Sequence, residues 1–415
     1  MELRLIEPHA TVNNSYMLDK YRILYRLADP GPNTKDAVRL KNAFRLIANA
    51  YQDIPGNAAA PYIWHPIEIA IITADKFRIS MDAILSALLQ DTIRDGKTSA
   101  TWLEQAFGVE VSTIVTKLNG LSEVAHLGIS KQAVIFKRLL SSFSPNNVTI
   151  ILIKIAEYLH KMRLLSNTAA SNPTEITAEI RHIYIPLAHQ LGLHHVQLEL
   201  EDLCLKFEHR RIYDDIANKI QATSATKQGF LERFTGPIHA ALQQEQFHQY
   251  VIKGRTKSVA SIWHKLNKRN IPFEEMHDLY AVRIIFESKR PKEYSNCWMI
   301  YELITALYEP RLDRIRDWIT YPKDSGYEAL HITVMSPEGQ WVEVQIRTTR
   351  MDDNAENGHA AHWKYKDQQL AKELADIDQE WLLQARSFLS DQWKQHTKSV
   401  DIRIHDLYHA KPRKK

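Results

Sequence analysis

The spacing of hydrophobic residues changes character past the middle of this 415-residue chain. Between residues 34 and 246 they recur mainly every three or four positions, which predicts a succession of helices. Helix-breaking pairs such as Pro55-Gly56, Asp95-Gly96 and Ser144-Pro145 separate these stretches. Residues 1–35 lack the spacing and are expected to be irregular. The predicted helices span residues 37–51, 66–74, 81–90, 133–143, 147–165, 175–191, 198–220 and 231–246.

A β-prone segment begins at Tyr250 and is expected to end at Gly254, where the chain enters another helix. This geometry places Arg255 and Lys257 at a strand-to-helix turn. Backbone N–H groups and the helix dipole at such a turn favour anions. Two later β-prone runs span residues 279–286 and 341–347.

The two later runs carry acidic residues that suit a metal ion. Alternation along the last run puts Glu343, Gln345 and Arg347 on one face of a strand. That face is poor core material, because burying an unpaired charge is costly. Asp278 directly precedes the other run. Two carboxylates near several lysines and arginines suit Mg²⁺ and nucleotide phosphates, so this half is predicted to be a phosphate-handling α/β domain.

Composition narrows the class of protein. The chain is 44% hydrophobic and 25% charged, which is typical of a globular protein of two or three domains. A net charge of +4 gives no strong nucleic-acid signal. The two cysteines, Cys204 and Cys297, support neither a disulfide framework nor a thiolate zinc site. There is no signal-peptide pattern and no apolar run of membrane-spanning length, so a cytoplasmic protein without a membrane partner is expected.

Three helical segments, 62–70, 87–95 and 154–163, resemble the metal-binding helices of HD-type phosphohydrolases. Those enzymes bind a divalent ion such as Mn²⁺ through two His and two Asp from separate helices. The resemblance points to the hydrolase domain of the RelA/SpoT-homologue family, which makes and breaks the alarmone (p)ppGpp.

Several working residues of that hydrolase are replaced in this chain. Gln90 stands in place of the HD histidine, Glu157 in place of the last aspartate, and Arg94 in place of one acid that aids hydrolysis. An amide oxygen is a weak ligand for a transition metal, and the Arg94 cation repels one. We therefore expect an inactive, regulatory helical scaffold without Mn²⁺. The residues of this degenerate site are His65, Gln90, Asp91, Arg94, Asp95 and Glu157.

Four segments of the second half, 254–265, 314–331, 342–348 and 359–365, resemble the family's synthetase motifs in order. The first resembles the ATP-binding loop and helix, and the second resembles the acceptor-nucleotide loop. The resemblance then covers roughly residues 35–390. It implies transfer of pyrophosphate from ATP to the 3′-hydroxyl of GDP or GTP, with release of AMP.

The resemblance also assigns roles residue by residue. It implies that Asp278 and Glu343 bind Mg²⁺, that Glu343 takes the proton from the acceptor hydroxyl, and that Arg255 completes the catalytic set. It assigns the ATP phosphates to Arg255, Lys257, Ser261, Lys265, Arg283 and Arg316. It assigns the acceptor nucleotide to Lys323, Tyr327, His331 and Gln345.

Other interpretations stay open at this point. Ser325 replaces the family's usual Asn, and this change together with the basic tail leaves an adenosine nucleotide or the 3′ end of tRNA open as the acceptor. Trp318 replaces a usual Tyr, a change that an aromatic site tolerates. A non-catalytic nucleotide sensor is a further alternative. Taken singly, Arg255 and Lys257 fit a solvated turn, and Tyr327 fits a packing residue.

The expected architecture is α+β and multidomain. An all-α HD-type domain precedes a nucleotidyltransferase-like mixed β-sheet flanked by helices. The ribosome- and tRNA-sensing regulatory domains of long family members are absent from this chain, which is either naturally short or truncated. The sequence does not fix the oligomeric state (a homo-oligomer included), the activating signal, GDP against GTP, or a regulatory nucleotide in the old hydrolase pocket. The expected divisions are an N-terminal segment (1–34), the HD-type domain (35–206), a helical linker (207–246), the synthetase domain (247–370) and a C-terminal helix with basic tail (371–415).

Overall fold

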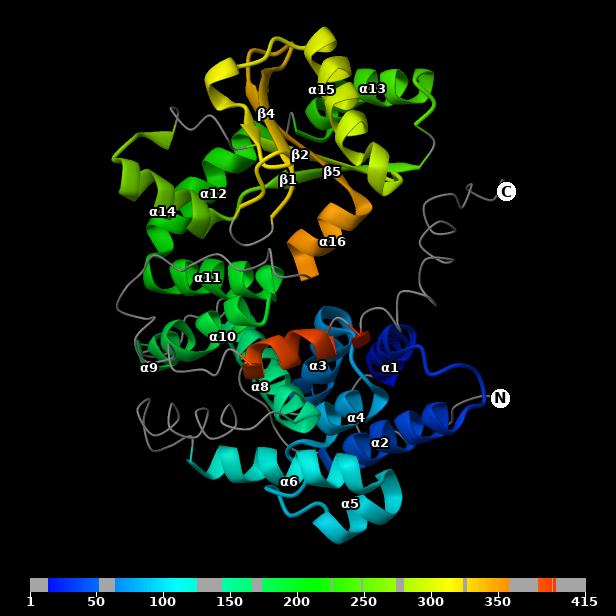
Figure 1. The fold of residues 1–415 in the computed structure, drawn as a ribbon. Helices are drawn as coiled ribbons and strands as arrows, with labels where there is room; N and C mark the ends of the chain where they lie inside the picture. Colours follow the sequence, from blue (N-terminus) through cyan, green and yellow to red (C-terminus); the bar gives the residue numbers. More distant parts are fainter. Residues whose placement is uncertain are drawn as a thin grey trace, which may run out of the picture. The chain divides into compact units, whose positions relative to one another are not determined.

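The structure is a computed structural model with two compact units. One unit comprises residues 1–187 together with 369–415, and the other comprises residues 188–368. We call them the helical unit and the sheet unit, and describe each by itself (Figure 1). The described residues are 14–51, 64–124, 144–165, 174–224, 227–247, 249–273, 280–323, 327–357, 380–389 and 391–392.

The helical unit has no strand among its described residues. Its π-helical turns, Thr73–Phe77 and Ile180–Tyr184, follow α3 and α9, and a further helix spans 380–389. None of the helices that the structure describes is long and apolar enough to cross a membrane. The labelled helices are α1 (Asn14–Ala28), α2 (Lys35–Tyr51), α3 (Trp64–Ile72), α4 (Met81–Leu89), α5 (Ala100–Phe107), α6 (Val109–Val124), α8 (Pro145–Leu165), α9 (Thr174–Glu179) and α10 (Ile185–Gln190), which continues into the other unit.

Helix α8 forms the centre of the helical unit and packs against α3, α4 and α6 (Figure 1). It is buried on all sides between Asn147 and His160. A helix that is hydrophobic all round belongs in a core. The two charged residues within this stretch, Lys154 and Glu157, therefore need partners inside the protein.

Two expectations differ from the structure here. Residues 1–35 were expected to be irregular, yet Asn14–Ala28 is helix α1, with Met17, Tyr21 and Leu24 on its buried face. These buried residues are four and three positions apart, which is helical spacing, but charged residues between them obscure the pattern in the sequence. The predicted helix 198–220 is in fact two helices that meet at His209. The predicted helix 133–143 lies outside the described residues.

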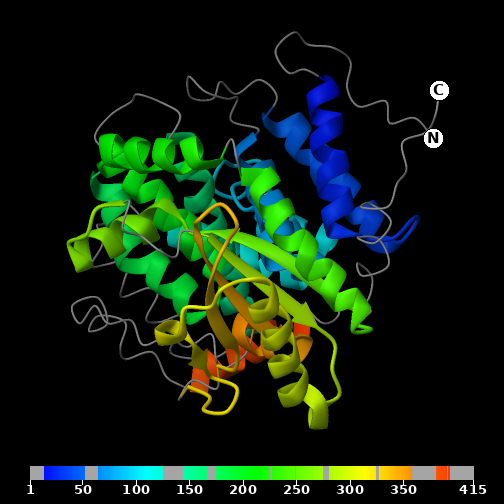
Figure 2. The same ribbon diagram turned by 90° about the horizontal axis from the view of Figure 1, so that it is seen from above.

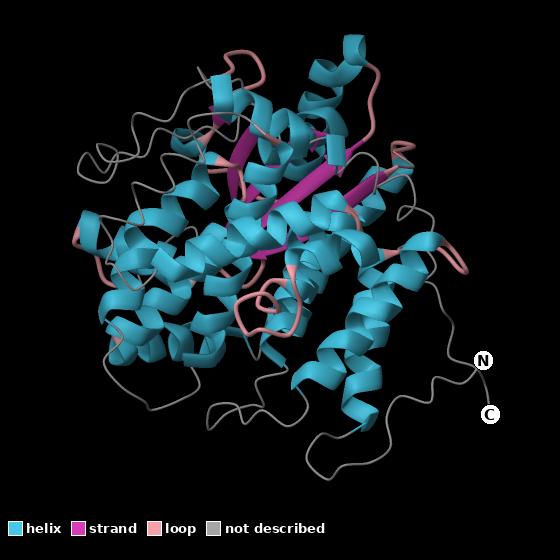
Figure 3. Cartoon of the chain, turned by 90° about the horizontal axis from the view of Figure 1, so that it is seen from below, coloured by secondary structure: helices cyan, strands magenta, loops and turns pink. Residues whose placement is uncertain are grey.

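The sheet unit is built on five strands in the order β1-β2-β5-β4-β3. Figure 3 shows strands in magenta among the helices. Only the β2–β5 pair is parallel among these described strands, so the sheet is mixed. The strands are β1 (Tyr250–Thr256), β2 (Tyr280–Phe286), β3 (Arg316–Asp317), β4 (Leu330–Met335) and β5 (Trp341–Thr348). The helices are α11 (His194–Glu208), α12 (Arg210–Ser224), α13 (Lys227–Gln244), α14 (Val259–Arg269), α15 (Glu293–Leu307) and α16 (Thr349–Asn357).

The sheet has one apolar face, covered by α13 and α15 (Figures 1 and 2). From α13, Phe234 and Ile238 enter this core, and from α15, Ile300 and Ile304 do so. Burying one such side chain contributes roughly 1.5–3 kcal/mol. Helix α13, in the segment predicted as a linker, is thus part of the sheet's core. The strand residues of this face, each at most 1% exposed, are Val282, Ile284, Phe286, Leu330, Ile332, Val334, Val342, Val344 and Ile346.

The predicted fold class is confirmed. A helical region is followed by a mixed five-stranded sheet with helices. The alternation in β5 follows the prediction, with Val342, Val344 and Ile346 in the core and Glu343 and Gln345 on the opposite face.

Candidate active site

The polar face of the sheet aligns predicted site residues across all five strands. Paired strand positions project to the same face, so a row of pairs forms a row of side chains. The row runs through the pairs Lys253↔Arg283, Arg283↔Gln345, Gln345↔His331 and His331↔Arg316. Sequence analysis placed all of these residues except Lys253 at the site, and the strand register explains how they meet.

The neighbouring row on the same face holds the candidate metal ligand. Glu343 pairs with Ala281 on β2 and with Thr333 on β4, while Ala281 pairs with Arg255. Asp278 lies outside the described residues. Tyr280 pairs with Val342, however, so the start of β2 runs beside Glu343. A carboxylate oxygen at Glu343 suits Mg²⁺, which prefers a few oxygen ligands with phosphate.

Five side chains on this face form a closed polar ring. Arg347 donates through Nη2 to the Tyr327 hydroxyl and to Oε1 of Gln345, the latter at 3.2 Å. The Tyr327 hydroxyl lies 2.7 Å from Nε2 of His331. Nδ1 of His331 lies 3.6 Å from Oε1 of Glu343, which also accepts from Nε2 of Gln345 at 2.7 Å. Contacts with Gln345 on one side and His331 on the other hold Glu343 in one orientation.

The charge state of His331 follows from its surroundings. Burial, and then the cations of Arg347 and Lys323, hold the pKa of His331 well below its usual range. A neutral imidazole has one donor and one acceptor nitrogen. The Tyr327 hydroxyl, whose pKa is raised mainly by burial, donates to Nε2, which assigns the Nδ1 proton toward Glu343. Within the ring, Glu343 therefore faces donors.

An aromatic cage lies next to the ring. Nζ of Lys323 is 3.8 Å from the ring centre of Trp318 and 4.9 Å from that of Tyr327. Burial, followed by the charge of Arg347, lowers the pKa of Lys323. Trp318 also meets His331 edge-on, with ring centres 4.6 Å apart. Tyr327, Lys323 and His331, predicted separately as acceptor contacts, thus lie together around Trp318, which sequence analysis left outside the site.

Asp352 is a second residue that sequence analysis missed. Its Oδ1 lies 3.0 Å from Nη1 of Arg283 and 3.2 Å from Nη1 of Arg347. Asp352 is on α16, and only the packing of α16 against β2 and β5 brings it to these arginines. It holds two cations of the polar face in place, and no spacing in the sequence indicates the contact.

Gly254 has a different role from the predicted one. Strand β1 continues through Gly254, which pairs with Val282, and ends at Thr256. A Cβ atom at Gly254 would lie 2.8 Å from Cδ1 of Leu231. Glycine at this position therefore permits close approach of a neighbouring side chain. Arg255 consequently belongs to the strand, and Lys257 lies in the short connection to α14.

The first amides of α14 are bonded within the protein, contrary to the expectation that they face an anion. The carboxylate of Asp202 on α11 accepts from the amides of Val259 at 3.3 Å and Ala260 at 2.7 Å. The Ser258 hydroxyl accepts from the amide of Ser261 at 3.2 Å. Burial raises the pKa of Asp202. Because Asp202 is distant in sequence, only the tertiary fold shows this cap. Ser261 and Lys265 lie on α14, as predicted.

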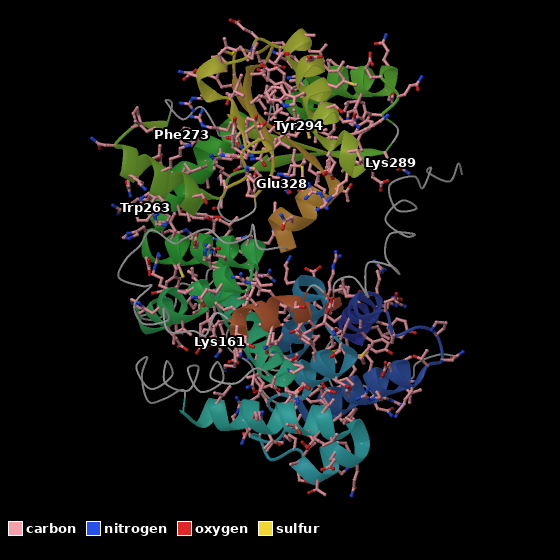
Figure 4. The ribbon with its side chains drawn as sticks, in the orientation of Figure 1. Lys161, Trp263, Phe273, Lys289, Tyr294 and Glu328 are labelled. Carbon is pink, nitrogen blue, oxygen red and sulfur yellow. The ribbon has the colours of Figure 1, made fainter. Side chains whose placement is uncertain are left out.

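In the helical unit, the predicted hydrolase site contains internal ion pairs. Glu157 lies 2.6 Å from Nζ of Lys154 and 2.5 Å from Nζ of Lys161 (Figure 4 labels Lys161). Burial opposes ionisation of Glu157, but the two lysines outweigh it and hold the pKa of Glu157 well below its usual range. Arg94 lies 2.9 Å from both Asp91 and Asp95.

The candidate ligands of this region can be compared with what a divalent metal ion needs. Among the described residues, no group of three or more His, Cys, Asp or Glu is arranged to hold one. Burial lowers the pKa of His65 to about 4, and the ring lies 5.1 Å from that of His160. Gln90, at the position of the HD histidine, has a buried Nε2 without a hydrogen-bond partner in the described part of the chain.

Comparisons with known proteins agree with the two-part architecture. Residues 43–194 match the HD domain, and residues 254–370 match the region found in RelA and SpoT proteins. The chain is 32% identical over 346 residues to the bifunctional (p)ppGpp synthase/hydrolase SpoT of Escherichia coli strain K12, covering 83% of this chain and 48% of that protein. It is also 32% identical over 356 residues to a GTP pyrophosphokinase of Myxococcus xanthus, covering 85% and 46%. The chain thus spans about half the length of these relatives.

Among solved structures, the chain is similar to small alarmone synthetase 1 from Bacillus subtilis bound to its product pppGpp. The identity is 20%, the TM-score is 0.26, and the match covers 48% of this chain and 97% of that one. A TM-score this low carries no argument about the site.

Fold and site together define a protein that joins an HD-type helical domain to a mixed sheet with a polar, cation-rich face. The chain belongs to the RelA/SpoT family.

Proposed function

We propose that this chain transfers the β,γ-pyrophosphate of ATP to the 3′-hydroxyl of GDP or GTP, forming (p)ppGpp and AMP. The observation that carries the proposal is the polar ring, which places Glu343 among arginine, tyrosine, histidine and glutamine on the polar face of the sheet. The proposal extends the activity named for the chain's relatives to this shorter sequence.

The residues divide the work of the reaction. Glu343, with Asp278, would hold Mg²⁺, which supplies charge neutralisation for the phosphates. Glu343 receives the proton as the acceptor hydroxyl attacks the β-phosphorus of ATP, and AMP leaves. Tyr327 stacks on the guanine, with Lys323 beside it. Arg283 and Arg347, held by Asp352, lie ready to stabilise charge on the transferred group.

We propose in addition that the HD domain of this chain is catalytically inactive and serves as a regulatory scaffold. The ion pairs of Lys154 and Lys161 with Glu157 support this, because they put built-in cations where a hydrolase needs a metal ion. The ion pair between Arg94 and Asp91 likewise puts a cation beside the carboxylate of Asp91, another predicted metal ligand.

The test is a product analysis. The protein is incubated with ATP, Mg²⁺ and either GDP or GTP, and AMP and 3′-pyrophosphorylated nucleotide are quantified. Glu343→Gln is expected to lower kcat at least about 100-fold, because a general base contributes on that scale. Glu302→Gln, at an exposed position of α15, is the matched control and is expected to keep full activity. Undiminished product from Glu343→Gln would refute the assignment.

The same preparation tests the helical unit. With Mn²⁺ and ppGpp, no release of pyrophosphate is expected. Manganese-dependent breakdown of ppGpp would refute the inactive-hydrolase proposal while leaving the synthetase proposal intact. Labelling of an adenosine nucleotide or of tRNA, with guanosine nucleotides unused, would instead establish a different acceptor.

A further inference from the structure

Arg350, the second residue of α16, binds two carboxylates from different parts of the sheet unit. Its Nε lies 3.0 Å from each oxygen of Glu293, and its Nη2 lies 2.8 Å from Oε2. Its Nη1 lies 2.5 Å from Oε2 of Glu328, and Nη2 lies 3.1 Å from Oε1 (Figure 4 labels Glu328). Such fork-to-fork pairs fix orientation as well as supplying energy. We call Arg350, Glu293 and Glu328 the arginine clamp.

The clamp rests on a rigid base. Glu293 begins α15, and its side chain is 9% exposed. Its Oε1 also accepts from the hydroxyl of Thr348, at the end of β5, at 3.0 Å. Burial alone would raise the pKa of Glu293, but the bonds from Arg350 and Thr348 hold it below its usual value. Glu293 therefore stays ionised at neutral pH and anchors the clamp to both α15 and β5.

The other end of the clamp holds the segment that carries Tyr327. Glu328 follows Tyr327 directly, and the two consecutive side chains bind different arginines, Arg350 and Arg347. The backbone of the segment is bonded through the Tyr327 carbonyl to the amide of Lys323, at 3.2 Å. The side chain of Glu328 thus ties this segment to the helix pair beneath it, because the Arg350 contact reaches α15 and α16 together.

We propose that Arg350 is a positioning residue for the acceptor nucleotide, acting through Glu328 on Tyr327; this inference rests on the proposed function. It holds the peptide of Tyr327 so that the aromatic ring is already placed for stacking when the acceptor arrives. Of the six predicted ATP residues, Arg255, Lys257, Ser261 and Lys265 lie on β1, on α14 or on the connection between them, away from the clamp in sequence. The other two, Arg283 and Arg316, lie on β2 and β3. Loss of the clamp should therefore affect the acceptor and spare ATP.

The experiment measures KM for each substrate in Arg350→Ala, Arg350→Lys and Glu328→Ala. Arg350→Ala and Glu328→Ala are each expected to raise the acceptor KM about tenfold, since a charge-assisted, partly exposed pair is lost. The KM for ATP is expected to stay within about twofold. Arg350→Lys should lie in between, because an ammonium cannot pair bidentately with two carboxylates. Arg210→Ala, which removes an exposed pair with Asp214, is the control and should match wild type.

The double variant Arg350→Ala/Glu328→Ala sharpens the test. If both residues act through the same contact, it should be no worse than Arg350→Ala alone. Glu328→Ala keeps the Arg350–Glu293 pair, so it tests the proposal even if Arg350→Ala fails to fold. Equal rises in both KM values, or an unchanged acceptor KM in Glu328→Ala, would overturn the inference alone. No transfer by the wild-type protein would overturn the proposed function and this inference with it.

Discussion

The ion pairs around Glu157 lead to a quantitative prediction about the stability of the helical unit. In Glu157→Gln, Lys154 keeps its charge but loses its carboxylate, and its side chain is only 6% exposed. Removing one partner of a buried pair costs about 3–5 kcal/mol, because the remaining charge is buried and uncompensated. Lys161 adds little, because at 38% exposure water screens its pair.

Differential scanning calorimetry of the whole chain measures this effect. For a unit of this size, the loss should lower the melting temperature of the helical unit by roughly 6–20 °C. Glu104→Gln, at an exposed position of α5, is the control and should leave the transition unchanged. Adding Lys154→Met to Glu157→Gln should recover much of the stability, because it removes the orphaned cation.

Metal chelation provides a second test on the same thermal transition. If Lys154 and Lys161 stand where a hydrolase binds its metal, chelation with EDTA should leave the wild-type transition in place. A shift of less than about 1 °C in Glu157→Gln, or a large loss of stability with EDTA, would refute the view that these lysines replace a metal ion.

Three further predictions concern other parts of the chain. Asp202→Asn keeps an acceptor for the amides of α14 but removes a negative charge near the predicted ATP loop, so steady-state kinetics should show an ATP KM lowered about threefold; an unchanged KM would contradict this. Lys323→Met should raise the acceptor KM about tenfold by removing the cation from the Trp318 cage, with ATP unaffected. His65 and His160 have pKa values lowered to about 4 by burial, below about 6.5 in the unfolded chain. The unfolded state therefore binds protons more readily than the folded state. The free energy of unfolding, measured by urea titration, should be highest above pH 6.5 and should decrease toward pH 4, by on the order of 3 kcal/mol for each ring.

The sequence predicted the layout of strand β5 because alternation depends only on local spacing. Glu343 and Gln345 lie on the polar face, as predicted, and Val342 and Val344 lie in the core. Helices were predicted where apolar spacing was uninterrupted, as in α8. Helix α1 was missed because charged residues interrupt the buried positions Met17, Tyr21 and Leu24.

Contacts between distant segments were beyond sequence reasoning. Asp202 caps α14 from 57 residues upstream, and nothing in the spacing of either segment indicates the pair. Asp352 meets Arg283 across 69 residues for the same reason. The first β-prone run was predicted to end at Gly254, whereas the strand continues through it and Gly254 leaves room for Leu231. The assignment of ligands to individual site residues remains a prediction, and Asp278 lies outside the described residues.

Because core and polar residues alternate along β5, an error in its strand register would disrupt both the core and the proposed active site. If β5 slipped by one position against β2 and β4, Glu343, Gln345 and Arg347 would point into the apolar core. Val344 and Ile346 would then point to the polar face. A chain with this register error would be unstable, would expose apolar side chains and would lack the residues proposed for catalysis. Cellular quality control that degrades proteins with exposed apolar surface would therefore also remove these inactive molecules.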